Sequence, residues 1–243
     1  MNNIRSVMLF CYDFPHKKTQ DFLLRFLAEG YHVSYIIAAP KKKLNISEPS
    51  IRIAPEHVGL IHPKLLCRRF NITYNVYDHN SKLAQLYIKK HPVDLSIISG
   101  ARILSPDIIN VMSGNVLNIH PGLLPEVRGL DTLLWSIYYD VAMGITGHLI
   151  GPKIDAGYLL YKERLHLQSD DTLIDISLRL LEKQTDTLMK SIKTLERNKR
   201  TSLKNLNMEH SRYNTKMPAD LEEKTVRRFP SWLKKHMHHS SSL

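Results

Sequence analysis

Short apolar segments alternate with amphipathic segments through the first half of the chain. The apolar segments have the length and the β-branched and aromatic content of buried strands; they are residues 6–11, 33–38, 73–77, 93–99 and 115–119. Helical spacing marks the segments between them; these are residues 18–31, 62–70, 81–90 and a helix beginning at Ser105. Residues 44–60 show weak periodicity and are expected to be irregular. The alternation predicts a doubly wound α/β fold with a largely parallel sheet.

The second half of the chain continues with fewer, longer elements. A helix is expected over residues 131–139, strands over 146–150 and 158–167, and a long amphipathic helix over 171–195. Beyond residue 198 the pattern weakens into polar, basic sequence. We therefore expect a catalytic domain over residues 1–200 and a small C-terminal extension over 201–243, used for substrate contact or dimerisation.

Cysteine content and hydropathy narrow the class of protein. The chain has two cysteines, Cys11 and Cys67, each in an apolar segment, so buried thiols are expected rather than a disulfide framework or a zinc site. No apolar run approaches the ~20 residues that cross a bilayer. The first residues lack the pattern of a secretion signal. These features predict a cytoplasmic protein without membrane insertion.

Positive charge is concentrated at the end of the chain. The net charge is +11, and residues 197–243 hold eleven Lys or Arg against four Asp or Glu. Such a tail suits a nucleic acid, an anionic membrane surface or a phosphorylated small substrate, and it also suits a plain solvated surface. Composition alone does not choose among them.

Two polar side chains stand together at the predicted end of the fifth strand. Asn118 and His120 are two residues apart, so their side chains point to the same side of the strand. An amide and an imidazole so placed can both bond one carbonyl oxygen, an arrangement that suits an oxyanion in acyl transfer. A capped strand end with a hydrogen-bonded histidine is the alternative. Asp155 follows a Gly151-Pro152 turn, where a carboxylate is usually a turn or capping residue.

Three motifs together resemble the formyltransferase superfamily. They are ARILSPDII, NIHPGLLP and GHLIGPKIDAG, and the likeness runs from about residue 70 to residue 160. The resemblance implies a Rossmann-like enzyme that moves a formyl group from 10-formyltetrahydrofolate to an amine without a metal. By motif position, Asn118 and His120 would hold the oxyanion. Asp155 would orient His120 and help to remove the amine's proton.

The same resemblance implies where the folate binds. The pterin slot would be formed largely through backbone groups of two segments, and the residues concerned are Arg102, Ile103, Leu104, Ile150, Gly151, Lys153 and Ile154. For Ile103 and Leu104, plain core packing is an alternative that is compatible with this role.

The chain differs from two branches of the superfamily, and these differences narrow the choice of amine substrate. The loop at residues 11–17 has no glycine and contains a proline, unlike the phosphate loop of glycinamide ribonucleotide formyltransferases. About forty residues follow the domain, which is too few for the tRNA-binding domain of methionyl-tRNA formyltransferases. The chain most resembles a third branch, the sugar-nucleotide N-formyltransferases, which have the same catalytic core with a small C-terminal extension. This resemblance implies a nucleotide-linked amino sugar, a surface-polysaccharide precursor, as the substrate of a homodimer that binds no nucleic acid.

Four residues are candidates for contacts with that substrate: Arg128, Tyr213, Lys216 and Trp232. The alternative for the two aromatic residues is that they anchor the tail or form a dimer interface. Enzymes of the other two branches remain alternative functions. A non-catalytic folate- or RNA-binding relative is also an alternative, although retention of Asn118, His120 and Asp155 argues against it.

Overall fold

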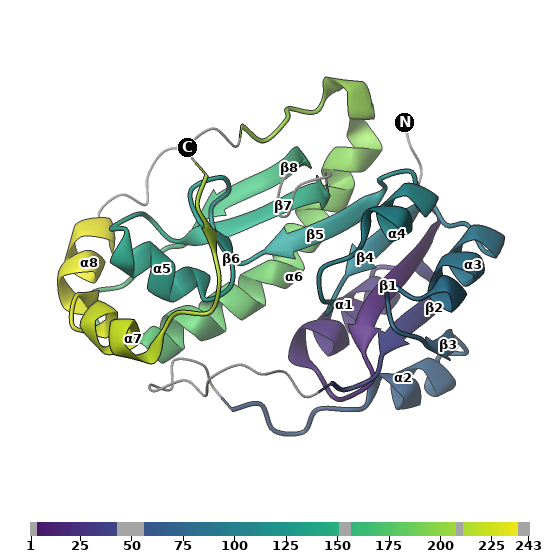
Figure 1. Cartoon of the computed structure of the whole chain (residues 1–243), viewed down its shortest axis with the longest axis horizontal. Coiled ribbons are helices and arrows are strands. Elements are labelled where there is room, and N and C mark those ends of the chain that lie inside the picture. The colour runs from purple at the N-terminus through teal and green to yellow at the C-terminus, as the bar shows by residue number, and fades with distance from the viewer. Residues whose placement is uncertain (1–3, 43–55, 151–156, 208–210, 238–243) are drawn as a thin grey trace.

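A seven-stranded sheet forms the centre of the molecule. The computed structural model describes residues 4–42, 56–150, 157–207 and 211–237. The strand order is β3-β2-β1-β4-β5-β7-β8 (Figure 1). The strands are β1 (Ser6–Tyr12), β2 (His32–Ala39), β3 (Thr73–Val76), β4 (Leu95–Ile98), β5 (Val116–His120), β7 (Gly144–Ile150) and β8 (Gly157–Arg164). The first five pair in parallel and the last two are antiparallel, which confirms the predicted fold class.

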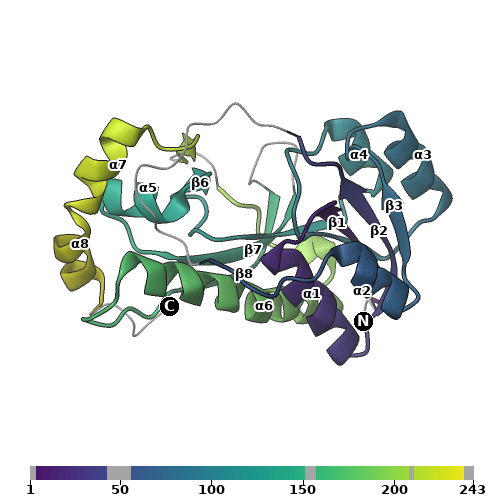
Figure 2. The same ribbon diagram turned by 90° about the horizontal axis from the view of Figure 1, so that it is seen from below.

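Helices cover both faces of this sheet, as a doubly wound fold requires. They are α1 (Lys17–Ala28), α2 (Pro63–Arg69), α3 (Lys82–Lys90), α4 (Pro106–Val111), α5 (Thr132–Tyr138) and α6 (Leu173–Arg197). Figure 2 shows α1, α2 and α6 on one side of the sheet and α3 and α4 on the other. All six lie where the sequence predicts helices, with ends shifted by a few residues.

Alternation along β1 builds a core on each face. Val7, Leu9 and Cys11 pack into the cluster under α1 and α6, whereas Met8 and Phe10 pack into the cluster under α3 and α4. A strand buried on both sides reads as a continuous apolar run, which is why residues 6–11 carry no polar alternation. Cys11 and Cys67 are buried thiols, as expected, and burial raises the pKa of each.

The residues after α6 pack onto the domain. A short 3₁₀ turn (Arg200–Ser202) follows α6, and then β9 (Tyr213–Asn214) pairs in parallel with β6 (Arg128–Gly129). Two further helices follow, α7 (Ala219–Val226) and α8 (Phe229–His236), and α7 packs against α5. The sequence pattern did not predict these two helices. The extension beyond residue 200 thus shares its buried residues with the domain, for example Met217 with Leu134 and Trp135.

Among the residues that the structure describes, no helix is long and apolar enough to cross a membrane. Within the same ranges, no group of three or more His, Cys, Asp or Glu side chains is placed to hold a metal ion.

Candidate active site

A pocket of about 520 Å³ opens at the carboxyl ends of β1, β4 and β5. Tyr12 ends β1, Ser99 and Gly100 follow β4, and Asn118 and His120 end β5. The chain crosses from β3 back past β1 to β4, so the strand order reverses at this point. Open α/β sheets bind their ligands at such a switch point. The pocket therefore lies where the fold class predicts a site, and it contains both polar residues that the sequence singled out.

Asn118 is held from the neighbouring strand by His148. The two residues are partners in the antiparallel pairing of β5 and β7, and Asn118 Nδ2 lies 3.2 Å from His148 Nε2. An amide nitrogen only donates, so Nε2 of the fully buried His148 is the acceptor. This bond orients the side-chain amide that the oxyanion role requires. His148 was not singled out from the sequence, because the antiparallel register that brings it to Asn118 has no local signal.

His120 is fixed by the loop that follows it. Its ring is 4% exposed, and Nε2 lies 2.9 Å from the carbonyl oxygen of Val127. Because that oxygen only accepts, Nε2 carries a hydrogen, and Nδ1 is the nitrogen that gains or loses a proton. Gly122 is necessary for this closure, since a Cβ there would lie 2.9 Å from Nε2. The contact with Val127 thus fixes the orientation of the ring in the pocket.

One lobe of the pocket is mainly apolar. It contains Arg102, Ile103 and Leu104 of the predicted folate segment, and Ile150 at the end of β7. Pro106 and Ile109 of α4 lie in the same lining. Leu104 is buried in the core cluster beneath α4, whereas Ile103 is 60% exposed. Core packing therefore accounts for Leu104 as well, and the exposed Ile103 is the better ligand contact of the two. The remaining predicted residues of the slot, Gly151, Lys153 and Ile154, lie outside the described residues, as does Asp155.

A second part of the lining, the polar lobe, comes from the end of β1 and the start of α1. Tyr12, His16 and Lys18 line it, and Lys18 Nζ donates to the carbonyl of Ile119 at 2.8 Å. The edge of the His16 ring meets the Tyr12 ring. Burial and, to a smaller extent, the charge of Lys18 lower the pKa of His16 to about 4, so this ring is neutral at neutral pH. These three residues were missed as site residues, although their place after the first strand at the switch point could have indicated them.

The predicted substrate residues fall into different environments. Tyr213 lines the pocket at 47% exposure, and its ring centroid lies 5.7 Å from the guanidinium carbon of Arg128. Arg128 and Lys216 are not part of the lining. Trp232 is 2% exposed and donates from Nε1 to the carbonyl of Val141 at 2.8 Å. The geometry of Trp232 therefore matches the anchoring alternative and not contact with a ligand in this pocket.

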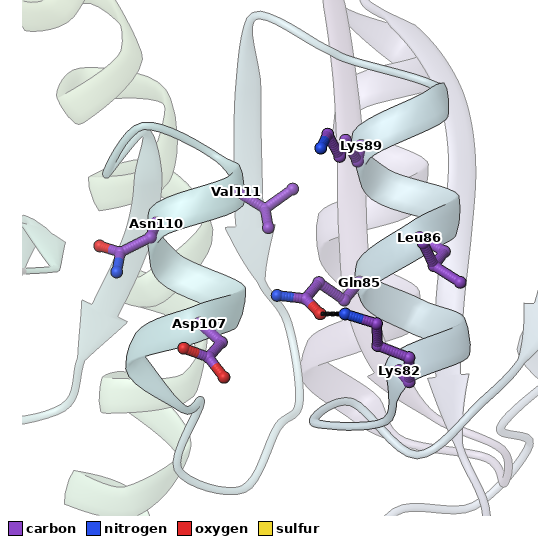
Figure 3. A pocket seen from close by; sticks show the side chains of 7 residues that line it. All are labelled: Lys82, Gln85, Leu86, Lys89, Asp107, Asn110 and Val111. Carbon is purple, nitrogen blue, oxygen red and sulfur yellow. Dashed lines mark hydrogen bonds between the residues drawn. The ribbon is translucent and has the colours of Figure 1, made fainter.

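A second hollow of about 420 Å³ lies between α3 and α4 (Figure 3). Its lining comes from two helices only, and it comprises Lys82, Gln85, Leu86, Lys89, Asp107, Asn110 and Val111. Within α3, Lys82 Nζ donates a hydrogen bond to Gln85 Oε1 at 3.0 Å. Asp107 is the hollow's one lining residue from the three motifs, and the hollow contains neither Asn118 nor His120. The pocket at the switch point is therefore the candidate active site.

Solved structures share this fold. A phosphoribosylglycinamide formyltransferase from Anaplasma phagocytophilum is 18% identical with a TM-score of 0.62, and the match covers 88% of this chain and 99% of that one. A 4-N formyltransferase from Francisella tularensis is 17% identical with a TM-score of 0.61, and the match covers 93% of this chain and 88% of that one. The fold is therefore that of the formyltransferases.

Sequence comparison identifies the family. The family model described as formyl transferase matches residues 61–192, more than half of the chain. The chain belongs to the formyl transferase family. The phosphoribosylglycinamide formyltransferase of Haemophilus influenzae is 30% identical over 100 residues, which are 40% of this chain and 47% of that protein. The methionyl-tRNA formyltransferase of Thermosynechococcus vestitus is 27% identical over 100 residues, 41% of this chain and 30% of that protein. This chain thus spans half or less of these relatives.

Proposed function

We propose that the protein transfers a formyl group from 10-formyltetrahydrofolate to the amine of a nucleotide-linked amino sugar. The observation that carries this proposal is the position of Asn118 and His120. Both come from the end of β5 and lie in one pocket whose lining also contains apolar residues and polar, aromatic residues. A formyl donor with a flat heterocycle and an amine substrate with polar groups can meet there, beside one amide and one imidazole.

The proposed reaction uses the two side chains in sequence. The neutral amine forms a bond to the formyl carbon, and the carbonyl electrons move to its oxygen. The side-chain amide of Asn118 stabilises that oxyanion, an effect worth ~3 kcal/mol for one donor. His120 Nδ1 takes the proton from the new nitrogen. The bond to the folate nitrogen then breaks, and that nitrogen receives the proton as it leaves. Proton transfer of this kind contributes roughly 10²–10⁴ in rate.

The folate is assigned to the apolar lobe. Ile103, Leu104, Ile109 and Ile150 present branched aliphatic groups there. A pterin is planar and needs apolar contact on its faces with hydrogen bonds at its edges, which backbone groups can supply. Asp155 is proposed to orient His120 from the loop between β7 and β8, as the resemblance of the motif implies.

The amine substrate is assigned to the polar lobe with Tyr12, His16 and Lys18, and to Tyr213, which also lines the pocket. Aromatic rings suit the faces of a nucleobase or sugar, and Lys18 supplies a positive charge for a phosphate. The structure of a sugar N-formyltransferase from Shewanella is similar: the match covers 92% of this chain, with 17% identity and a TM-score of 0.60. This likeness supports the choice of an amino sugar. A homodimer and a cytoplasmic location remain predictions.

A second candidate substrate is glycinamide ribonucleotide, which the 30% identical relative from Haemophilus influenzae favours. Turnover assays separate the two. The purified protein is mixed with 10-formyltetrahydrofolate and, in turn, dTDP-, UDP- and GDP-linked amino sugars, glycinamide ribonucleotide and charged initiator tRNA. Release of tetrahydrofolate is followed in each mixture. We expect stoichiometric release with an amino-sugar nucleotide. Faster release with glycinamide ribonucleotide or with tRNA would overturn the assignment.

A further inference from the structure

The C-terminal segment holds the same peptide group that holds His120. The carbonyl of Val127 accepts the bond from His120 Nε2 at 2.9 Å, and the N–H of Arg128 donates to the carbonyl of Arg212 at 3.1 Å. These two groups belong to one planar peptide unit, which is trans. In a trans peptide the C=O and the N–H point in opposite directions. The bond to Arg212 therefore fixes the direction in which Val127 presents its oxygen to the imidazole.

Asn214 joins the strands at this point. It is buried in β9, and its Nδ2 donates to the carbonyls of Arg128 and Arg212, both at 3.1 Å. Its Oδ1 accepts from the hydroxyl of Tyr139 at the end of α5, at 2.8 Å. Its backbone carbonyl accepts from the N–H of Leu130 at 3.0 Å. One amide side chain thus connects β6, β9 and α5, and it shares the carbonyl of Arg212 with the N–H of the peptide that contacts His120.

Gly129 permits this close approach. It has a φ of +88°, and a Cβ at this position would lie 1.9 Å from the carbonyl oxygen of Asn214. Any side chain would therefore displace β9 from β6. The backbone of residues 128–130 and the backbone of β9 fit together only without a side chain at residue 129.

We propose that Asn214 is a positioning residue for His120, and that it acts through the Val127–Arg128 peptide. A peptide whose N–H is already bonded is a stronger acceptor at its carbonyl, because hydrogen bonds in a chain polarise one another. The oriented carbonyl keeps the hydrogen of the neutral imidazole on Nε2 and leaves Nδ1 able to take a proton. The consequence for turnover rests on the proposed function, whereas the consequence for the His120 tautomer does not.

The test replaces Asn214 with alanine and measures both consequences. Nitrogen NMR of the substrate-free protein reports the tautomer of His120, assigned by the loss of its signals in a His120→Gln variant. We expect the ratio of the Nε2–H to the Nδ1–H tautomer to fall about fivefold or more. We expect kcat for formyl transfer to fall about tenfold with an unchanged KM for the formyl donor, as a misplaced catalytic group would cause.

Thr215→Ala is the matched control. Thr215 is exposed in the same segment, and its backbone carbonyl, which accepts from Trp135 Nε1 at 2.9 Å, is unaffected by the change. This variant should keep both the tautomer ratio and kcat of the parent protein. If the tautomer ratio or kcat of Thr215→Ala fell as much as that of Asn214→Ala, the effect would be a general one of the segment. That result would overturn the specific role of Asn214.

Tyr139→Phe gives a milder variant if Asn214→Ala does not fold. It removes only the hydroxyl bonded to Asn214 and keeps the ring, which stacks on Trp135 and lies under Arg212. The tautomer ratio should change in the same direction by a smaller factor. If the parent enzyme is active but the tautomer ratio of His120 is unchanged in the folded variants, the positioning role alone is overturned. A changed ratio in a protein that forms no product with any amine overturns the proposed function alone.

Discussion

Asn118 and His148 face each other across β5 and β7, with the amide nitrogen 3.2 Å from the imidazole Nε2. His148 is fully buried, so the position of its ring is set by packing, and the ring in turn orients the amide. The oxyanion site therefore depends on a residue that contacts no substrate in the proposed reaction.

We expect His148→Phe to lower turnover by about 10- to 100-fold, because the amide loses the acceptor that orients it. His148→Gln keeps an acceptor at the end of a similarly long side chain and should retain more activity than the Phe variant. Steady-state kinetics with the preferred amine measure both. Equal activity of the Phe variant and the parent protein would show that the contact does not orient Asn118.

Asn118→Ala and His120→Ala should each lower kcat by about a hundredfold or more, since one removes an oxyanion donor and the other a proton carrier. Both variants should still bind the formyl donor, because the apolar lobe is formed by other residues. The double variant should lose much less than the product of the single losses, since the two groups act on one transition state. Near-normal turnover of His120→Ala would exclude the proposed mechanism.

Much of this site could be predicted from local sequence. Buried parallel strands appear in the sequence as continuous apolar runs. Asn118 and His120 lie at the end of one such run, two residues apart. Helices with a clear apolar stripe, such as α6, were predicted almost to their ends. These features depend on neighbours along the chain, so a single sequence contains them.

What could not be predicted depends on contacts between distant segments. Tyr213 was a candidate, but the pairing of β9 with β6, more than eighty residues earlier, that brings it to the pocket has no local signal. The antiparallel register that brings His148 to Asn118 has none either. The helices α7 and α8 are eight residues each, and packing against the domain stabilises them more than their own periodicity does. Trp232 was a reasonable substrate candidate in a basic tail, but its burial is visible only in the folded protein.

A different prediction concerns acid stability. The pKa of His16 falls from 6.5 to about 4 on folding, chiefly because burial disfavours the charged ring. Between these values the unfolded chain binds more protons than the folded one, so the free energy of unfolding decreases as the pH falls from 6.5 toward 4. We expect His16→Asn to show a smaller decrease over this window. Denaturant titrations at several pH values measure it, and an unchanged slope would contradict a neutral His16.

Two aromatic residues of the tail should respond differently to replacement. Trp232→Ala should lower the free energy of unfolding by about 3–5 kcal/mol, because a large buried side chain leaves a cavity. Its KM for the amine should not change in the folded fraction. Tyr213→Ala should change stability by less than about 0.5 kcal/mol. It should raise that KM about tenfold through loss of a stacking surface. The opposite distribution of effects would assign the substrate contact to Trp232.

The response to salt should distinguish a small substrate from a nucleic acid. A protein that neutralises several phosphates of a polynucleotide loses affinity steeply with salt, by about 0.7–0.9 in the logarithmic slope for each phosphate. A diphosphate offers only about two charges, and the Lys and Arg residues of the pocket lining are Lys18 and Arg102. We expect the KM for an amino-sugar nucleotide to change only a few-fold between about 50 and 200 mM salt.

Bulk tRNA added to the assay should not inhibit turnover. Although the C-terminal tail is basic, the aromatic and apolar residues of the tail pack on α5. Strong inhibition by tRNA that disappears at high salt would show that the tail binds nucleic acid and would reopen the choice of substrate.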